Sequence, residues 1–96
     1  MSQIVIRKGR KTDGKNLLAL IKALAEFEKL RQPDRAAQQR LLRDAFGPGK
    51  RFDTLLGFVN NNIAGYAIIF ETYSSFRALP TLYLEDIFVL QDWLGL

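Results

Sequence analysis

The sequence predicts an α+β fold in which a strand and two helices precede a three-strand antiparallel meander. Apolar residues recur at intervals of three and four within residues 17–27 and again within 41–46, as in amphipathic helices. After residue 52 the pattern becomes that of strands, and the run of asparagines at 60–62 predicts a turn because asparagine tolerates left-handed backbone angles. At 96 residues, without a linker or repeat, we expect one domain spanning residues 1–96.

The first half of the chain is predicted to hold one strand and both helices. Residues 4–7 read as a short opening strand. Asp13 is suited to cap a first helix that continues to about Leu30. Asp34 is suited to cap a second helix, which the glycines and proline at 47–49 end.

The second half is predicted to be all strand. Residues 52–60 and 63–73 form a hairpin, residues 74–80 form a loop, and residues 81–90 form the last strand. That last strand is apolar on both faces apart from Glu85 and Asp86, and such strands usually have neighbours on both edges. One neighbour is evident, so we expect the exposed edge to recruit a partner, as a homodimer or through the missing half of a larger fold.

Composition excludes several classes of function. The chain has no cysteine and no histidine, which excludes disulfides, thiol catalysis, Ser-His-Asp chemistry and most zinc or iron sites, so no metal is expected. The net charge of +4 is compatible with a solvated basic surface or with nucleic-acid binding. We favour the solvated surface because aromatic residues do not interleave with the basic ones. Attraction of a phosphorylated cofactor is a third reading. No apolar run is long enough for a membrane span and the apolar start is too short for a signal peptide, so we expect a cytoplasmic protein.

Few side chains remain as candidates for chemistry. Glu85 and Asp86 are consecutive in a strand, so we expect them to face opposite sides, one of them buried. The buried carboxylate either forms an ordinary ion pair or capping contact, or binds a cationic substrate or acts through water as a base. Phe27 and Glu28, at the end of the first helix, read most simply as a core residue and a surface residue, and Trp93 as a packing anchor.

Together these segments resemble the GNAT N-acetyltransferases, and within them the spermidine/spermine (diamine) acetyltransferase branch. The segments that carry the resemblance are residues 4–7, 20–28, 42–47, 73–76 and 82–89, the last two being the most specific. The resemblance covers essentially all of the chain and the first half of the family fold.

The resemblance implies an acetyltransferase that moves an acetyl group from acetyl-CoA to a small primary amine, such as a polyamine or amino acid. It implies that Glu85 contacts the amine as the catalytic carboxylate and that Phe27, Glu28 and Asp86 line the same site. It also implies cofactor contacts through the backbone of three strand residues and the first glycine of a pyrophosphate loop, namely Ile87, Phe88, Val89 and Gly95.

The chain departs from the family pattern at its end. Leu94 stands where the family has Arg or Gln, one loop glycine is present, and the later general-acid tyrosine is absent. We therefore expect the chain alone to be weak or inactive. The alternative is a non-catalytic, shortened relative that acts at most as a dimerising module.

Overall fold

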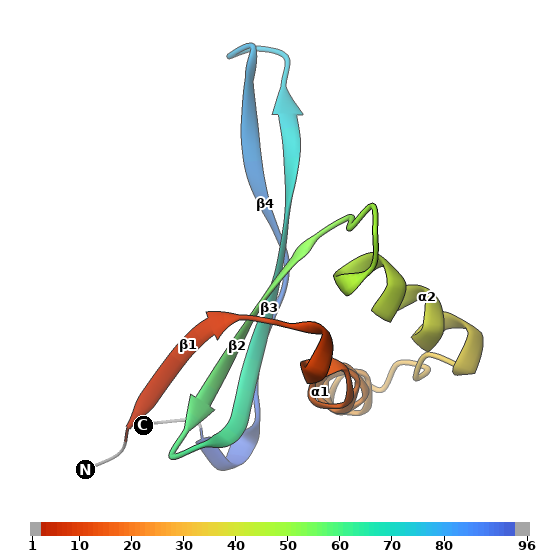
Figure 1. Ribbon diagram of the computed structural model, residues 1–96, viewed down its shortest axis with the longest axis vertical. Helices are drawn as coiled ribbons and strands as arrows, with labels where there is room; N and C mark the ends of the chain where they lie inside the picture. The colour runs from red at the N-terminus through yellow and green to blue at the C-terminus, as the bar shows by residue number, and fades with distance from the viewer. Residues whose placement is uncertain (1–2, 94–96) are drawn as a thin grey trace.

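The computed structural model describes residues 3–93, which fold as four antiparallel strands and two helices (Figure 1). The sheet order is β1-β2-β3-β4, and the predicted α+β arrangement is confirmed. Two short 3₁₀ turns, η1 (Lys11–Asp13) and η2 (Gln91–Trp93), precede α1 and follow β4. The bounds of the longer elements are β1 (Ile4–Lys8), α1 (Gly14–Phe27), α2 (Arg35–Phe46), β2 (Asp53–Val59), β3 (Asn62–Ser74) and β4 (Leu79–Val89).

At the start of α1, the side chain of Asp13 has a different role from the predicted helix cap. Asp13 precedes the helix, but its side chain makes no capping bond to α1. Its buried carboxylate accepts hydrogen bonds from the Arg10 backbone N–H at 2.7 Å and from both terminal nitrogens of Arg7 at 2.8 and 2.9 Å. The pKa of Asp13 is lowered, above all by the hydrogen bonds from Arg7. Asp13 therefore ties the first strand to the turn before the helix.

The other helix ends follow local rules. The helix α1 ends at Phe27 rather than at Leu30, because Lys29 takes a left-handed φ of 57° that terminates the helix. Asp34 caps α2 as predicted, with its carboxylate accepting a hydrogen bond from the Ala37 N–H at 2.9 Å.

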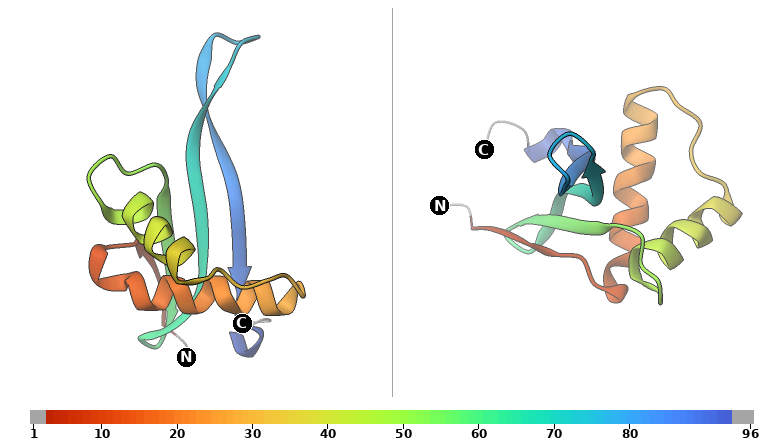
Figure 2. Two further views of the ribbon diagram at one scale, coloured as in Figure 1. Left: turned by 90° about the vertical axis from the view of Figure 1, so that its right-hand side faces the viewer. Right: turned by 90° about the horizontal axis from the view of Figure 1, so that it is seen from above.

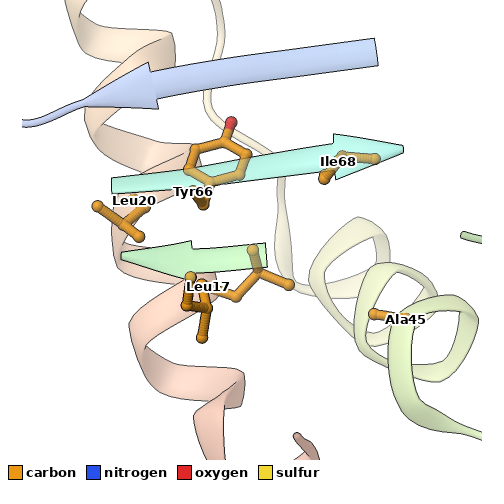
Figure 3. Close-up of a cluster of buried hydrophobic side chains, with 6 residues drawn as sticks. Leu17, Leu20, Ala45, Tyr66 and Ile68 are labelled. Atoms are coloured by element: carbon orange, nitrogen blue, oxygen red, sulfur yellow. The ribbon is translucent and has the colours of Figure 1, made fainter. Parts of the chain in front are cut away.

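Both helices lie on one face of the sheet (Figure 2). Their inner faces meet the strands in a core of six buried residues (Figure 3), which are Leu17, Leu20, Ala45, Leu56, Tyr66 and Ile68. Leu17 and Leu56 are fully buried, so this helix-covered face excludes water.

Neither helix covers the opposite face of the sheet (Figure 2). The register places Ile6, Gly57, Gly65 and Val89 in one row across the four strands. Since side chains alternate along a strand, this row faces away from the row that contains Leu56 and Tyr66. We call it the open face.

The hairpin of β3 and β4 is longer than predicted. Pairing continues out to Ser74 and Leu79, so the predicted loop over 74–80 is reduced to a tight turn in which Ala78 takes a φ of 56°. The distal half of this hairpin projects beyond the rest of the sheet (Figure 1). Phe76 at its tip is fully exposed.

Candidate functional site

An irregularity in β4 decides which carboxylate reaches the helix-covered face. Ile69 is paired with Leu84 and Ile68 with Asp86, so Glu85 is one extra residue in β4, a β-bulge. Without the extra residue, Asp86 would keep the alternation of Leu84 and turn to the open face. The bulge brings Asp86 onto the same face as buried Ile68 and next to Phe88.

Tyr66 holds Asp86 on that face. Tyr66 lies opposite Phe88 in the register, so Asp86 is its diagonal neighbour on the same side of the sheet. The Tyr66 hydroxyl donates a hydrogen bond of 3.3 Å to Asp86 Oδ2. Figure 3 shows the hydroxyl directed from β3 toward β4. Burial raises the pKa of Tyr66, and the charges of Asp86 and Glu28 raise it further, so the phenol stays a proton donor.

The end of α1 approaches the same place. The Phe27 ring lies 6.2 Å from the Phe88 ring, which lies 6.5 Å from the Tyr66 ring. Glu28 follows Phe27 directly as the C-cap of α1, and its charge contributes to the raised pKa of Tyr66. Phe27 is 72% exposed at the last position of α1, so the expectation that it is a core residue is wrong.

We call five residues at this place the acidic–aromatic cluster: Phe27, Glu28, Tyr66, Asp86 and Phe88. The two carboxylates of the cluster have no basic partner within residues 3–93, where the ion pairs are Arg7–Asp13, Arg43–Asp44 and Lys50–Asp53. Asp86 and Glu28 are therefore available to a cation that comes from outside the described residues. The expected ordinary ion pair is replaced by the tyrosine hydroxyl.

Glu85, the predicted catalytic residue, stands apart from the cluster. It is exposed, whereas Asp86 is half-buried, so of the two expected orientations the inward one belongs to Asp86. Strict alternation is interrupted at Glu85 by the bulge. Glu85 is nevertheless adjacent to the cluster along the chain.

The predicted cofactor residues lie on the free edge of β4. Ile87, Phe88 and Val89 are paired with β3 on one side, and within the described residues no strand pairs with their other side. Alternate backbone groups there are open to a ligand. Beside them the open face has a groove of about 360 Å³, lined at this end by Ile87, Val89 and Trp93. Gly95 lies outside the described residues.

No cluster of three or more potential metal-binding side chains occurs among residues 3–93. No helix in that range is long and apolar enough to cross a membrane.

Tyr66 is the member of the cluster that the sequence analysis missed. Its contact with Asp86 depends on the register of β3 against β4 and on the bulge, and neither is visible in the sequence. The available signal is weak: a tyrosine in the apolar middle of a strand needs a partner for its hydroxyl.

The sequence is similar to those of known acetyltransferases. The chain is 29% identical to the thialysine N-epsilon-acetyltransferase of Sus scrofa, over 99% of this chain and 60% of that protein. It is 34% identical to the spermidine/spermine N(1)-acetyltransferase-like protein 1 of Homo sapiens, over 100% of this chain and 15% of that protein. No protein-family model matches the chain.

Solved structures show the same fold. The aminoglycoside N-acetyltransferase AAC(6')-Iy in complex with CoA superposes with a TM-score of 0.77 at 20% identity, over 99% of this chain and 60% of that one. The chain spans about 60% of the length of the first curated relatives it matches. Sequence and fold together relate this chain, over that part of their length, to the GNAT N-acetyltransferases of the thialysine and spermidine/spermine branch.

Proposed function

We propose that the chain provides the amine-binding part of a GNAT-type N-acetyltransferase, which transfers an acetyl group from acetyl-CoA to a primary amine such as a polyamine or an amino acid. The observation that carries the proposal is the acidic–aromatic cluster. Asp86 on β4 and Glu28 at the end of α1 bring two carboxylates without a basic partner in residues 3–93 to one aromatic surface.

This arrangement suits an alkylammonium group. Carboxylates stabilise its charge, and the faces of aromatic rings attract cations. Phe27 is the exposed ring of the cluster, so it is available to the methylene groups of a substrate. The names of the relatives, with spermidine, spermine and thialysine, support amines of this kind.

The reaction needs the amine in its neutral form. Glu85, which is exposed and next to Asp86 along β4, is our candidate for the group that accepts a proton from the ammonium group through water. The amine nitrogen then bonds to the thioester carbonyl carbon and the carbon–sulfur bond breaks. The proton that this nitrogen loses as the amide forms passes to the sulfur through water, so CoA leaves as the thiol. Backbone N–H groups on the free edge of β4 at Ile87–Val89 are suited to hold the carbonyl oxygen as it gains charge.

Acetylation measured with purified chain tests this proposal. The assay follows release of CoA from acetyl-CoA in the presence of spermidine, lysine or thialysine. We expect weak turnover at most, since the phosphate-binding loop of the family is represented by one glycine. Any turnover should be abolished by Glu85→Gln and kept by Glu71→Gln, which removes an exposed carboxylate from β3.

When turnover is absent, binding measurements test the amine site and the acetyl-CoA site separately. Isothermal titration with spermidine, lysine and thialysine tests the amine site, and titration with acetyl-CoA tests the edge of β4. Amine binding that Asp86→Asn weakens supports the proposed site. Failure of all three amines to bind would reject it.

A second candidate function is a non-catalytic dimerising module. The observation that favours it is the exposed apolar surface of β4, where Leu82, Leu84 and Ile87 are each at least half exposed on a free edge. Light scattering after size-exclusion chromatography tests it: a stable dimer that neither binds amine nor acetylates it supports this function, and a monomer rejects it.

A further inference from the structure

The Tyr66 hydroxyl has no role in packing. Its ring is 3% exposed and lies within the core cluster beside Leu20 and Ile68. A phenylalanine would fill the same volume without placing a hydroxyl in the interior, where it needs a hydrogen-bond partner. The partner that the fold provides is Asp86 Oδ2.

The donor of this hydrogen bond is held more firmly than its acceptor. The Tyr66 ring is held by the core and by the tilted Phe88 ring, so its hydroxyl has a fixed position. Asp86 is half-buried at the free edge of the sheet, on a strand segment that the bulge displaces. A fixed donor therefore orients a carboxylate that would otherwise choose among rotamers.

We propose that Tyr66 is a positioning residue for the amine site: its hydroxyl holds one oxygen of Asp86 and leaves the other to receive the ammonium group of the substrate. The inference rests on the proposed function, because it assigns Tyr66 a part in the same site. Tyr66 itself does not touch the amine. It acts through Asp86 and selects for cationic over neutral ligands.

The phenol is suited to this part because it keeps its proton at neutral pH. Burial and the charges of Asp86 and Glu28 raise the pKa of Tyr66, so its hydroxyl remains a donor to Asp86 Oδ2.

A double-mutant cycle tests the proposal, with spermidine as the probe in isothermal titration at pH 7. The proteins are the wild type, Tyr66→Phe, Asp86→Ala and the double variant. We expect Tyr66→Phe to weaken spermidine binding about fivefold, the equivalent of one hydrogen bond of about 1 kcal/mol. In the Asp86→Ala background the same change should have no effect, since the carboxylate it positions is gone.

The cycle distinguishes positioning from a structural role. A structural role would lower affinity by the same factor in both backgrounds, and that additivity would overturn the inference. Thermal unfolding checks that each variant is folded at the temperature of the titration. The affinity for acetyl-CoA should be unchanged by Tyr66→Phe. Butanol, a neutral ligand of similar apolar character, should show no dependence on Tyr66.

The outcomes also separate this inference from the proposed function. If the wild type binds spermidine and Tyr66→Phe binds it equally well, the role of Tyr66 is rejected and the amine site stands. If the wild type binds no amine, the amine site and the role of Tyr66 both fail.

Discussion

The two faces of one sheet differ sharply in what covers them. On the helix-covered face Leu56, Tyr66 and Ile68 are at most 7% exposed, while on the open face Ile6 and Ile87 are about 70% exposed. The same strands thus contribute a closed core on one side and bare apolar surface on the other. The difference indicates that the covered face carries the stability of the described residues, and that the acidic–aromatic cluster lies where that cover ends, at the last turn of α1.

The largest effect is expected in the core of the covered face. Leu56→Ala should lower the free energy of unfolding by about 3 kcal/mol, because it leaves a cavity under both helices. Ile87→Ala on the open face is the matched control and should cost at most about 0.5 kcal/mol. Urea denaturation followed by circular dichroism measures both. Equal losses would remove the distinction between the faces.

The next effect concerns the link between the first strand and α1. Asp13→Asn should destabilise the fold by about 2 kcal/mol, because a buried carboxylate loses charge-assisted hydrogen bonds. The measurement is the free energy of unfolding as a function of pH.

The pH dependence has a definite sign. The folded-state pKa of Asp13 lies below its unfolded value, chiefly because of the hydrogen bonds from Arg7. The stabilisation is therefore fully present above the unfolded pKa, about 4, and is lost as the pH falls through the folded value. The Asp13→Asn variant should not lose this stabilisation at low pH. The loss of stability due to Asp53, whose pKa is lowered by its hydrogen bond with Lys50, should persist in the variant. If the free energy of unfolding fell equally with pH in the wild type and in Asp13→Asn, the assignment of this pH dependence to Asp13 would be contradicted.

A smaller effect is expected at the start of α2. Asp34→Ala removes the hydrogen bond to the Ala37 N–H and should cost about 1 kcal/mol. Asp34→Asn keeps a capping oxygen and should cost little, so it serves as control. Thermal unfolding separates them, and an equal loss in both would show that the charge matters rather than the cap.

The smallest effect on stability, and a distinct effect on assembly, is expected on the open face. Ile6→Ser with Ile87→Ser should change the free energy of unfolding by less than about 1 kcal/mol, since both side chains are already exposed. If the open face holds two copies together, the same pair should shift light scattering from dimer toward monomer. Unchanged mass for a dimeric wild type would exclude this face as the contact.

Much of the fold could be predicted because its signals are local. Asp34 caps a helix, and asparagines at 60 and 61 take the left-handed angles of a hairpin turn. Leu17 and Leu20 follow helical spacing into the core. Asp13 was misassigned because its partners, Arg7 and the Arg10 N–H, compete for the carboxylate that a cap would use.

The candidate site depends on longer-range features than the fold does. The end of α1 at Phe27 and the bulged part of β4 approach one another through Phe88, and the residues alone gave no reason to join them, whereas the family resemblance did. What decides their geometry is the bulge at Glu85, which turns Asp86 toward Tyr66. Local sequence does not encode which residue a strand bulges out, so neither the exposure of Glu85 nor the contact of Tyr66 could be foreseen.

The most direct test of the central claim is a two-dimensional ¹H–¹⁵N NMR titration of the chain with spermidine. We expect the largest shifts at the end of α1 and along the bulged part of β4, at Phe27, Glu28, Asp86 and Phe88, and we expect Asp86→Asn to reduce them. Saturating shifts confined to the distal hairpin around Phe76, or no shifts at millimolar spermidine, would contradict the claim that these residues form an amine site.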